Sequence, residues 1–298
     1  MNSNRSLKYF WKLLLCWAVF LAAFLLEGKL LSFFGVGFSG LWEGMASTIS
    51  LLIIGSLAFV FILTCVSRNV HANWFFRWIM LEMFMWEVAI VGLILKSFFP
   101  ATTSRDPSLF STLSVALAVL LPSLVVTALI AYLFRPAQIA IPGLNHRRVL
   151  SATWRIIAGS IAFPLVCIIS RLMAQSIFRD TSGLFQLHHS WGLILSLTLI
   201  HGSILSAASL PIIKWWQGSK GKLWWVLGGS FWLFPAITTA LCAQGLHVSP
   251  ANILENILVA FGYAGVLVTL FGHSKIAADS HIHSQWHKDM VGYAAFFR

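Results

Sequence analysis

The sequence predicts an all-α fold, a polytopic bundle of about eight transmembrane helices with the N-terminus and the C-terminus in the cytoplasm. The composition is strongly apolar, with 58% hydrophobic residues, 10% charged residues and a mean hydropathy of +0.84. Ordinary soluble domains carry about 25% charged residues. Eight apolar stretches reach or approach the roughly 20 residues that a helix needs to cross ~30 Å of hydrocarbon. These two observations exclude a soluble protein.

The spans follow one another with short connections. The three clearest, at 45–66, 109–134 and 223–243, carry no charge. The others are expected near 9–26, 78–99, 156–178, 190–211 and 251–272. We expect the first span to be retained, because Glu27 and Lys29 follow it in place of a small-x-small cleavage site. No hydrophilic stretch is long enough for a separate soluble domain, so residues 1–298 are expected to form one membrane domain that ends in a His-rich tail at 273–298.

Two local features modify this simple bundle. Leu30–Phe34, after the first span, is expected to lie along the outer interface or to dip into the membrane as a re-entrant segment. Pro122, Pro164 and Pro235 lie near the middle of the fourth, fifth and seventh spans, where plain helix kinks are expected. The two halves of the chain show no convincing inverted repeat.

Basic residues fix the orientation, because short cytoplasmic loops carry an excess of Lys and Arg. With the N-terminus inside, 15 of the 20 Lys and Arg, Arg77 among them, fall on the inner side. Each can contribute about 1 kcal/mol of attraction to anionic lipid head groups. We therefore expect an integral membrane protein, in the bacterial cytoplasmic (inner) membrane, whose partners are these lipids and possible subunits of a membrane complex. Nucleic acid is not needed to explain the charge.

Ionisable groups at membrane depth are candidates for a functional site, because a charge at the bilayer centre costs several kcal/mol. Glu82 and Glu87 lie on the third predicted span, with Glu87 near the midplane. At ~100° per residue they point about 140° apart, so they do not form a carboxylate pair on one face. Glu87 is the stronger candidate. The alternative is a structural carboxyl that is protonated or paired with an arginine.

Other spans carry polar residues that complete a candidate substrate-binding site or proton relay. They are His188, His189 and His201 on the sixth span, Arg171 and Gln175 on the fifth, and Glu255 on the eighth. Together they predict a polar cavity that opens to the outside and ends near Glu87 and His201. A midplane carboxylate and histidine are also the groups that a proton relay uses.

The spacing of the histidines suggests two possible cofactors, haem and zinc, and neither is favoured. His188 and His201 are thirteen positions apart, as in transmembrane haem helices, but haem needs a facing ligand and no second span carries a comparable pair. In the tail, His283 and His287 share a face if the segment is helical, and His281 lies nearby. Such spacing can chelate zinc, but no fourth ligand is identifiable.

Three classes of function remain for this chain. A permease or transporter is favoured, because kinked central helices and a buried carboxylate and histidine occur without any soluble catalytic domain. The first alternative is a membrane-embedded enzyme that acts on a lipid or lipophilic substrate, with Glu87 or His201 as general base. The second is a non-catalytic subunit of a larger membrane complex. The sequence assigns no catalytic residue.

Overall fold

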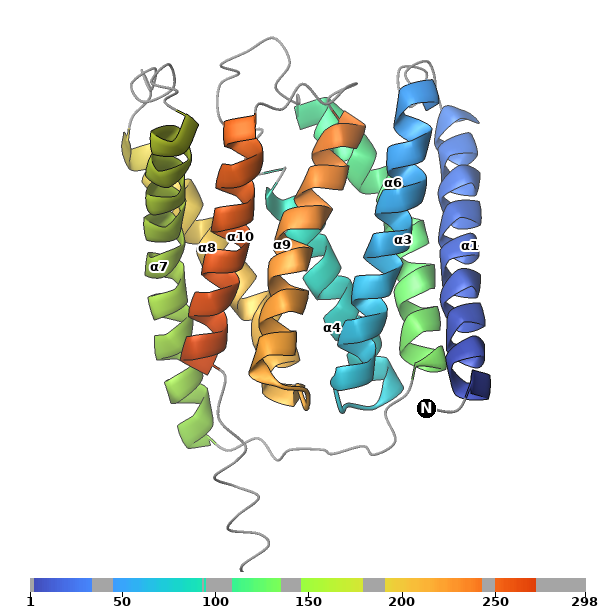
Figure 1. Cartoon of the computed structure of the whole chain (residues 1–298), viewed down its shortest axis with the longest axis horizontal. Helices are drawn as coiled ribbons and strands as arrows, with labels where there is room; N and C mark the ends of the chain where they lie inside the picture. The colour runs from blue at the N-terminus through green and yellow to red at the C-terminus, as the bar shows by residue number, and fades with distance from the viewer. Residues whose placement is uncertain are drawn as a thin grey trace, which may run out of the picture.

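The protein is an upright bundle of helices (Figure 1). The computed structural model describes residues 3–33, 45–92, 94, 109–134, 146–178, 191–242 and 250–271, and these contain eight helices and no strand. In chain order the helices are α1 (Ser3–Phe33), α3 (Met45–Asn69), α4 (Trp74–Trp86), which continues as the π-helical turn η1 (Glu87–Val91), α6 (Leu109–Leu133), α7 (His146–Phe178), α8 (Trp191–Trp215), α9 (Lys220–Cys242) and α10 (Pro250–Phe271). The prediction of an all-α bundle is confirmed.

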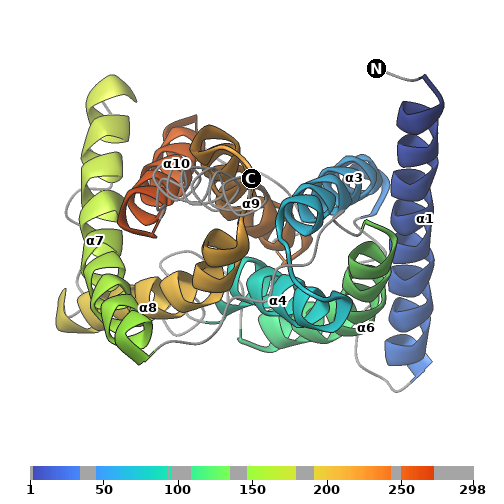
Figure 2. The ribbon, with the colours of Figure 1, turned by 90° about the horizontal axis from the view of Figure 1, so that it is seen from below.

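The lengths and surfaces of the helices identify an integral membrane protein. Within the described residues, four helices are long and apolar enough to cross a membrane, over Leu7–Leu30, Thr153–Phe178, Leu195–Trp215 and Pro250–Phe271. Helices α1 and α7 lie at opposite edges of the bundle (Figure 2), and large apolar side chains of both are exposed. In a membrane these side chains would contact lipid.

Most described helix ends lie within a few residues of the predicted spans, but α1 is longer at both ends and α7 begins earlier. Helix α1 continues to Phe33, so the described start of the segment predicted as interfacial or re-entrant extends the first helix. Helix α7 begins at His146, well before the predicted Ile156. Helix α4 begins at Trp74, where the side-chain oxygen of Asn73 accepts a hydrogen bond from the N–H of Phe76 and caps the first turn.

The bundle consists of two halves of four helices each, seen side by side in Figure 2. The first half contains α1, α3, α4 with η1, and α6, and the second contains α7, α8, α9 and α10. In each half the first helix packs against the second and the fourth, and the third packs against the fourth. Between the halves, α3 packs against α9 and α4 packs against α8. The second helix of each half therefore contacts the third helix of the other half.

The two halves are joined through their equivalent loops, which connect α3 to α4 and α8 to α9. The N–H of His71 donates to the carbonyl oxygen of Trp215 at 3.1 Å, and the N–H of Gln217 donates to the carbonyl oxygen of Asn69 at 2.8 Å. These two bonds flank an isolated antiparallel bridge. The loops lie at the end of the bundle where the chain begins and α10 ends (Figure 1).

A buried arginine stabilises the same end of the bundle. The side chain of Arg77, on the first turn of α4, is 2% exposed and donates to the carbonyl oxygens of Phe134 at 3.2 Å and Ala131 at 2.6 Å. Lys12 donates to the carbonyl oxygen of Leu133 at 3.1 Å. The last carbonyls of α6 have no partner within the helix, and cations near a helix C-terminus are favourable. The sequence counts Arg77 among the basic residues of the inner face, but the structure uses it inside the protein.

We predict that a disulfide forms between the paired loops in the variant Val70→Cys/Trp216→Cys, made in a chain whose native cysteines are replaced by alanine. Val70 and Trp216 are bridge partners. Their flanking bonds make them a non-hydrogen-bonded antiparallel pair, whose Cα atoms lie about 4.5 Å apart, within the range for disulfides. Peptide mass spectrometry after mild oxidation should find the link in most molecules. The pair Val70→Cys/Lys222→Cys is the control, and equal linking in both variants would contradict the loop pairing.

Candidate functional site

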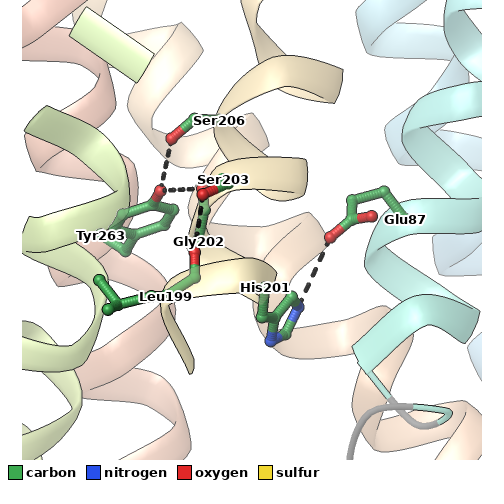
Figure 3. Close-up of polar contacts among 7 residues, drawn as sticks. All are labelled: Glu87, Leu199, His201, Gly202, Ser203, Ser206 and Tyr263. Carbon is green, nitrogen blue, oxygen red and sulfur yellow. Dashed lines mark hydrogen bonds and ion pairs between the residues drawn. The ribbon is translucent and has the colours of Figure 1, made fainter. Parts of the chain in front are cut away.

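The structure brings Glu87 and His201 together between the two halves. Glu87 opens the π-helical turn η1, its side chain is 2% exposed, and its Oε1 lies 3.6 Å from Nε2 of His201 on α8 (Figure 3). Neither carboxyl oxygen of Glu87 accepts a hydrogen bond from any described residue. Most buried polar groups are hydrogen-bonded, and π-helical turns occur frequently at functional sites. Both facts single out Glu87.

The imidazole of His201 is positioned from two sides. The ring of Phe163, on α7, meets it edge to face at a centroid distance of 5.0 Å. On the other side, Gly92 follows η1, and a Cβ atom there would lie 3.0 Å from Cε1 and 3.3 Å from Nε2 of His201. That spacing is tighter than ordinary van der Waals contact, so glycine leaves the space that the imidazole occupies. The side chain of His201 is 22% exposed.

Tyr263 of α10 holds α7 and α8 together behind His201 (Figure 3). Its hydroxyl lies 3.0 Å from the carbonyl oxygen of Gly202, 3.2 Å from that of Gly159 and 2.7 Å from Oγ of Ser206. Its ring meets the ring of Phe163 edge to face at 4.8 Å. Phe163, which contacts His201, is therefore itself fixed by a fully buried tyrosine.

Glu82 has a different environment from Glu87. Its Oε1 accepts hydrogen bonds from Nε1 of Trp86 and from Oγ of Ser123, each at 2.7 Å, and its Oε2 accepts one from Oγ1 of Thr127 at 2.7 Å. Ser123 and Thr127 belong to α6. Glu82 therefore ties α4 to α6, while Glu87 faces α8, as the angle between their positions on the helix requires.

Arg171, Gln175 and Glu255 are half-buried and lie at another level of the bundle. The rings of Phe163 on α7 and Tyr263 on α10 are in contact, and Arg171 and Glu255 are each eight positions away along these helices. At 1.5 Å per residue that is about 12 Å, toward the end of the bundle opposite the paired loops. These residues therefore lie farther from the paired loops than Glu87 and His201 do, and the cavity predicted to connect them stays a prediction.

Several predicted site residues lie outside the described residues. They are His188, His189, His281, His283 and His287. Their predicted parts in a polar cavity and in a zinc site stay predictions. Among the residues that the structure describes, no group of three or more His, Cys, Asp or Glu side chains could hold a metal ion.

One buried carboxylate was not recognised as part of the bundle from the sequence. Glu27 on α1 is 9% exposed and accepts a hydrogen bond from the N–H of Leu121 on α6 at 3.0 Å. Leu121 precedes Pro122, and a proline inside a helix disturbs the backbone bonding of its turn. The predicted first span ends at Leu26, so the sequence predicts Glu27 beyond the membrane helix, whereas α1 continues past it.

The chain matches no protein-family model, no curated protein and no solved structure. The function is therefore inferred from the geometry of Glu87 and His201, a buried carboxyl and a half-buried imidazole at the junction of two four-helix halves.

We predict different effects on stability when Glu82 and Glu87 are each replaced by alanine. Glu82→Ala removes the acceptor of three hydrogen bonds, and bonds to charged groups contribute about 1.5–3 kcal/mol each. It should lower the melting temperature of the detergent-purified protein by roughly 5 °C or more. Glu87→Ala removes a carboxyl that accepts no such bond, so the melting temperature should stay within about 2 °C or rise. A larger loss for Glu87→Ala than for Glu82→Ala would contradict this assignment.

Proposed function

We propose that the protein is a proton-coupled permease of eight membrane spans, with both termini in the cytoplasm, in the bacterial inner membrane. The observation that carries the proposal is Glu87, a carboxyl buried between the two halves whose oxygens accept no hydrogen bond from the described residues and which has a histidine as neighbour. The excess of basic residues on the inner side supports the orientation. These residues would contact anionic lipid head groups.

The pair of Glu87 and His201 has the chemistry to bind and release a proton. The distance of 3.6 Å from Oε1 to Nε2 is longer than a hydrogen bond but short enough for an ion pair when the imidazole is protonated. A proton on Glu87 neutralises the carboxylate and removes the cost of a charge at membrane depth. Release of that proton restores an acceptor with two unused oxygens, which a polar substrate can bind. Proton binding and substrate binding then compete for one group, and this competition is the basis of coupling.

The position of the pair also favours transport. Glu87 lies 13 positions after the start of α4, and His201 lies 14 positions before the end of α8, so both are about 20 Å from the paired loops. A bilayer with its head groups is about 40–45 Å thick, so this depth fits a site at the midplane when the paired loops lie at the membrane surface. Many secondary transporters bind their substrate at the midplane between two structural repeats.

The two alternatives have less support. An enzyme acting on a lipid needs a lipophilic site at its catalytic group. A groove of about 340 Å³ does lie between α7, α9 and α10, but neither Glu87 nor His201 lines it. A purely structural subunit would be expected to use its buried carboxyls in helix contacts, as Glu82 does. Glu87 makes no such hydrogen bond to the described residues.

We predict that substitution of Glu87 abolishes coupled proton movement. Purified protein would be reconstituted into liposomes that contain a pH-sensitive dye, and gradients of amino acids, small amines, carboxylates and sugars would be imposed one at a time. At least one solute should drive proton movement, and Glu87→Gln should reduce that movement at least tenfold, because the amide keeps the shape of the side chain but cannot exchange a proton.

Glu82→Gln is the matched control, since it is the same substitution on the same helix at a group that only accepts structural hydrogen bonds. It should retain most of the proton movement. Equal movement in the wild-type protein and Glu87→Gln would contradict the proposal, as would the absence of proton movement with every solute.

A further inference from the structure

The two halves of the chain correspond residue by residue around their paired loops. Helix α3 ends at Asn69 and α8 at Trp215, and α4 begins at Trp74 and α9 at Lys220, so both pairs of positions are 146 apart. The reciprocal hydrogen bonds between the loops obey the same offset, because each bond is converted into the other when the halves are exchanged. This is the pattern that a twofold axis through the loops produces.

The caps of the two following helices repeat at the same offset. The side-chain oxygen of Asn73 accepts from the N–H of Phe76 at 2.8 Å, and Oγ of Ser219 accepts from the N–H of Lys222 at 3.3 Å. In each case the capping residue lies directly before the helix, and its hydrogen bond spans three positions. The sequences differ, but the same local structure starts both helices.

Burial repeats with the same register along the helices that meet between the halves. Pairs of positions 146 apart are buried together, including Val60 with Ser206, Leu63 with Ser209, Leu81 with Leu227, and Met85 with Phe231. Side chains of one helix face recur every three to four residues, so a shift of one residue would break the agreement. Corresponding helices therefore bury the same faces in the bundle.

A twofold axis generates two equivalent seams, and only one of them carries Glu87 and His201. The polar seam lies between α4 with η1 and α8, and the apolar seam lies between α3 and α9. The positions that correspond to Glu87 and His201 in the apolar seam are Leu233 and Gly55. One seam has thus kept or gained a polar pair that the other lacks.

The apolar seam is closed by aromatic packing. The rings of Phe59 on α3 and Phe234 on α9 lie 4.7 Å apart, and both side chains are buried. Their counterparts in the polar seam are the smaller aliphatic residues Leu205 and Val88, also buried. Beside them, the oxygens of Glu87 accept no hydrogen bond from the described residues. A buried carboxyl without a hydrogen bond is costly, and water that reaches it removes this cost.

We propose that the chain consists of two equivalent four-helix units related by a twofold axis, and that water carries protons to Glu87 along the polar seam, while the apolar seam stays closed. The inference rests on the proposed permease function for what the water delivers. The route itself is a property of the fold, so it can be tested without a known substrate.

The twofold relation supplies matched positions for the test. Leu205→Cys and Phe59→Cys are corresponding single-cysteine variants at the same depth, made with Cys16, Cys65, Cys167 and Cys242 replaced by alanine. Sealed vesicles would be treated with 2-(trimethylammonium)ethyl methanethiosulfonate, a small cationic thiol reagent that reacts with cysteines in contact with water. Leu205→Cys should react at least ten times faster than Phe59→Cys. Val88→Cys and Phe234→Cys form a second pair with the same expected difference.

The control variants work against the expected result. Replacing a phenylalanine by cysteine opens more space than replacing leucine or valine, so it would raise the reactivity of the apolar seam rather than lower it. Equal rates within a pair, faster reaction at Phe59→Cys or Phe234→Cys, or no reaction at any of the four positions would each overturn the inference.

The outcome is separable from that of the permease proposal. Fast reaction at Leu205→Cys together with unchanged proton movement in Glu87→Gln would support the route and reject the permease. Loss of proton movement in Glu87→Gln together with an unreactive Leu205→Cys would retain the permease and overturn the route.

Discussion

Hydrocarbon offers no hydrogen-bonding partner, so a chain that crosses a membrane has to satisfy its polar backbone groups within the protein. Helices satisfy most of these groups, and buried side chains take those left where a helix ends or is disturbed. Arg77 covers carbonyl groups at the end of α6. Glu27 accepts the N–H that precedes Pro122, and the hydroxyl of Tyr263 lies against carbonyl groups of α7 and α8. Much of the polar interior is therefore committed to structure.

Glu87 differs from these groups, because its oxygens accept no hydrogen bond from the part of the chain that the structure describes. Glu82, five positions earlier, uses both of its oxygens to hold α6. Glu87 begins the turn where the backbone changes from α to π, faces the other half of the chain, and approaches the imidazole of His201. The imidazole is in turn held by Phe163 and by the space at Gly92. Packing thus fixes the position of His201, while the carboxyl opposite it accepts no hydrogen bond from the described residues.

The sequence predicts where the helices lie along the chain, but it does not predict which helices pack side by side. Apolar runs mark the helices, since spanning length and composition are local properties, and the angle between Glu82 and Glu87 follows from helical geometry. The partners of these residues depend on which helices meet, and no local pattern encodes that. For the same reason the sequence assigns Arg77 to the basic residues of the cytoplasmic face, because its burial against α6 depends on which helices meet. The relation between the halves cannot be read from the sequence either, because it is visible in helix caps, loop hydrogen bonds and burial rather than in residue identity.

The covalent connection between the two units has a consequence for how a site of this kind can arise. In a symmetric homodimer, each residue occurs twice, and a self-complementary interface repeats every contact on both sides of the axis. A carboxyl and a histidine placed between identical units would therefore appear in both seams, and any opening would weaken the assembly twice. In a single chain the units can diverge. One junction retains aromatic packing at Phe59 and Phe234, and the other is free to become polar without loss of the joint that holds the molecule together.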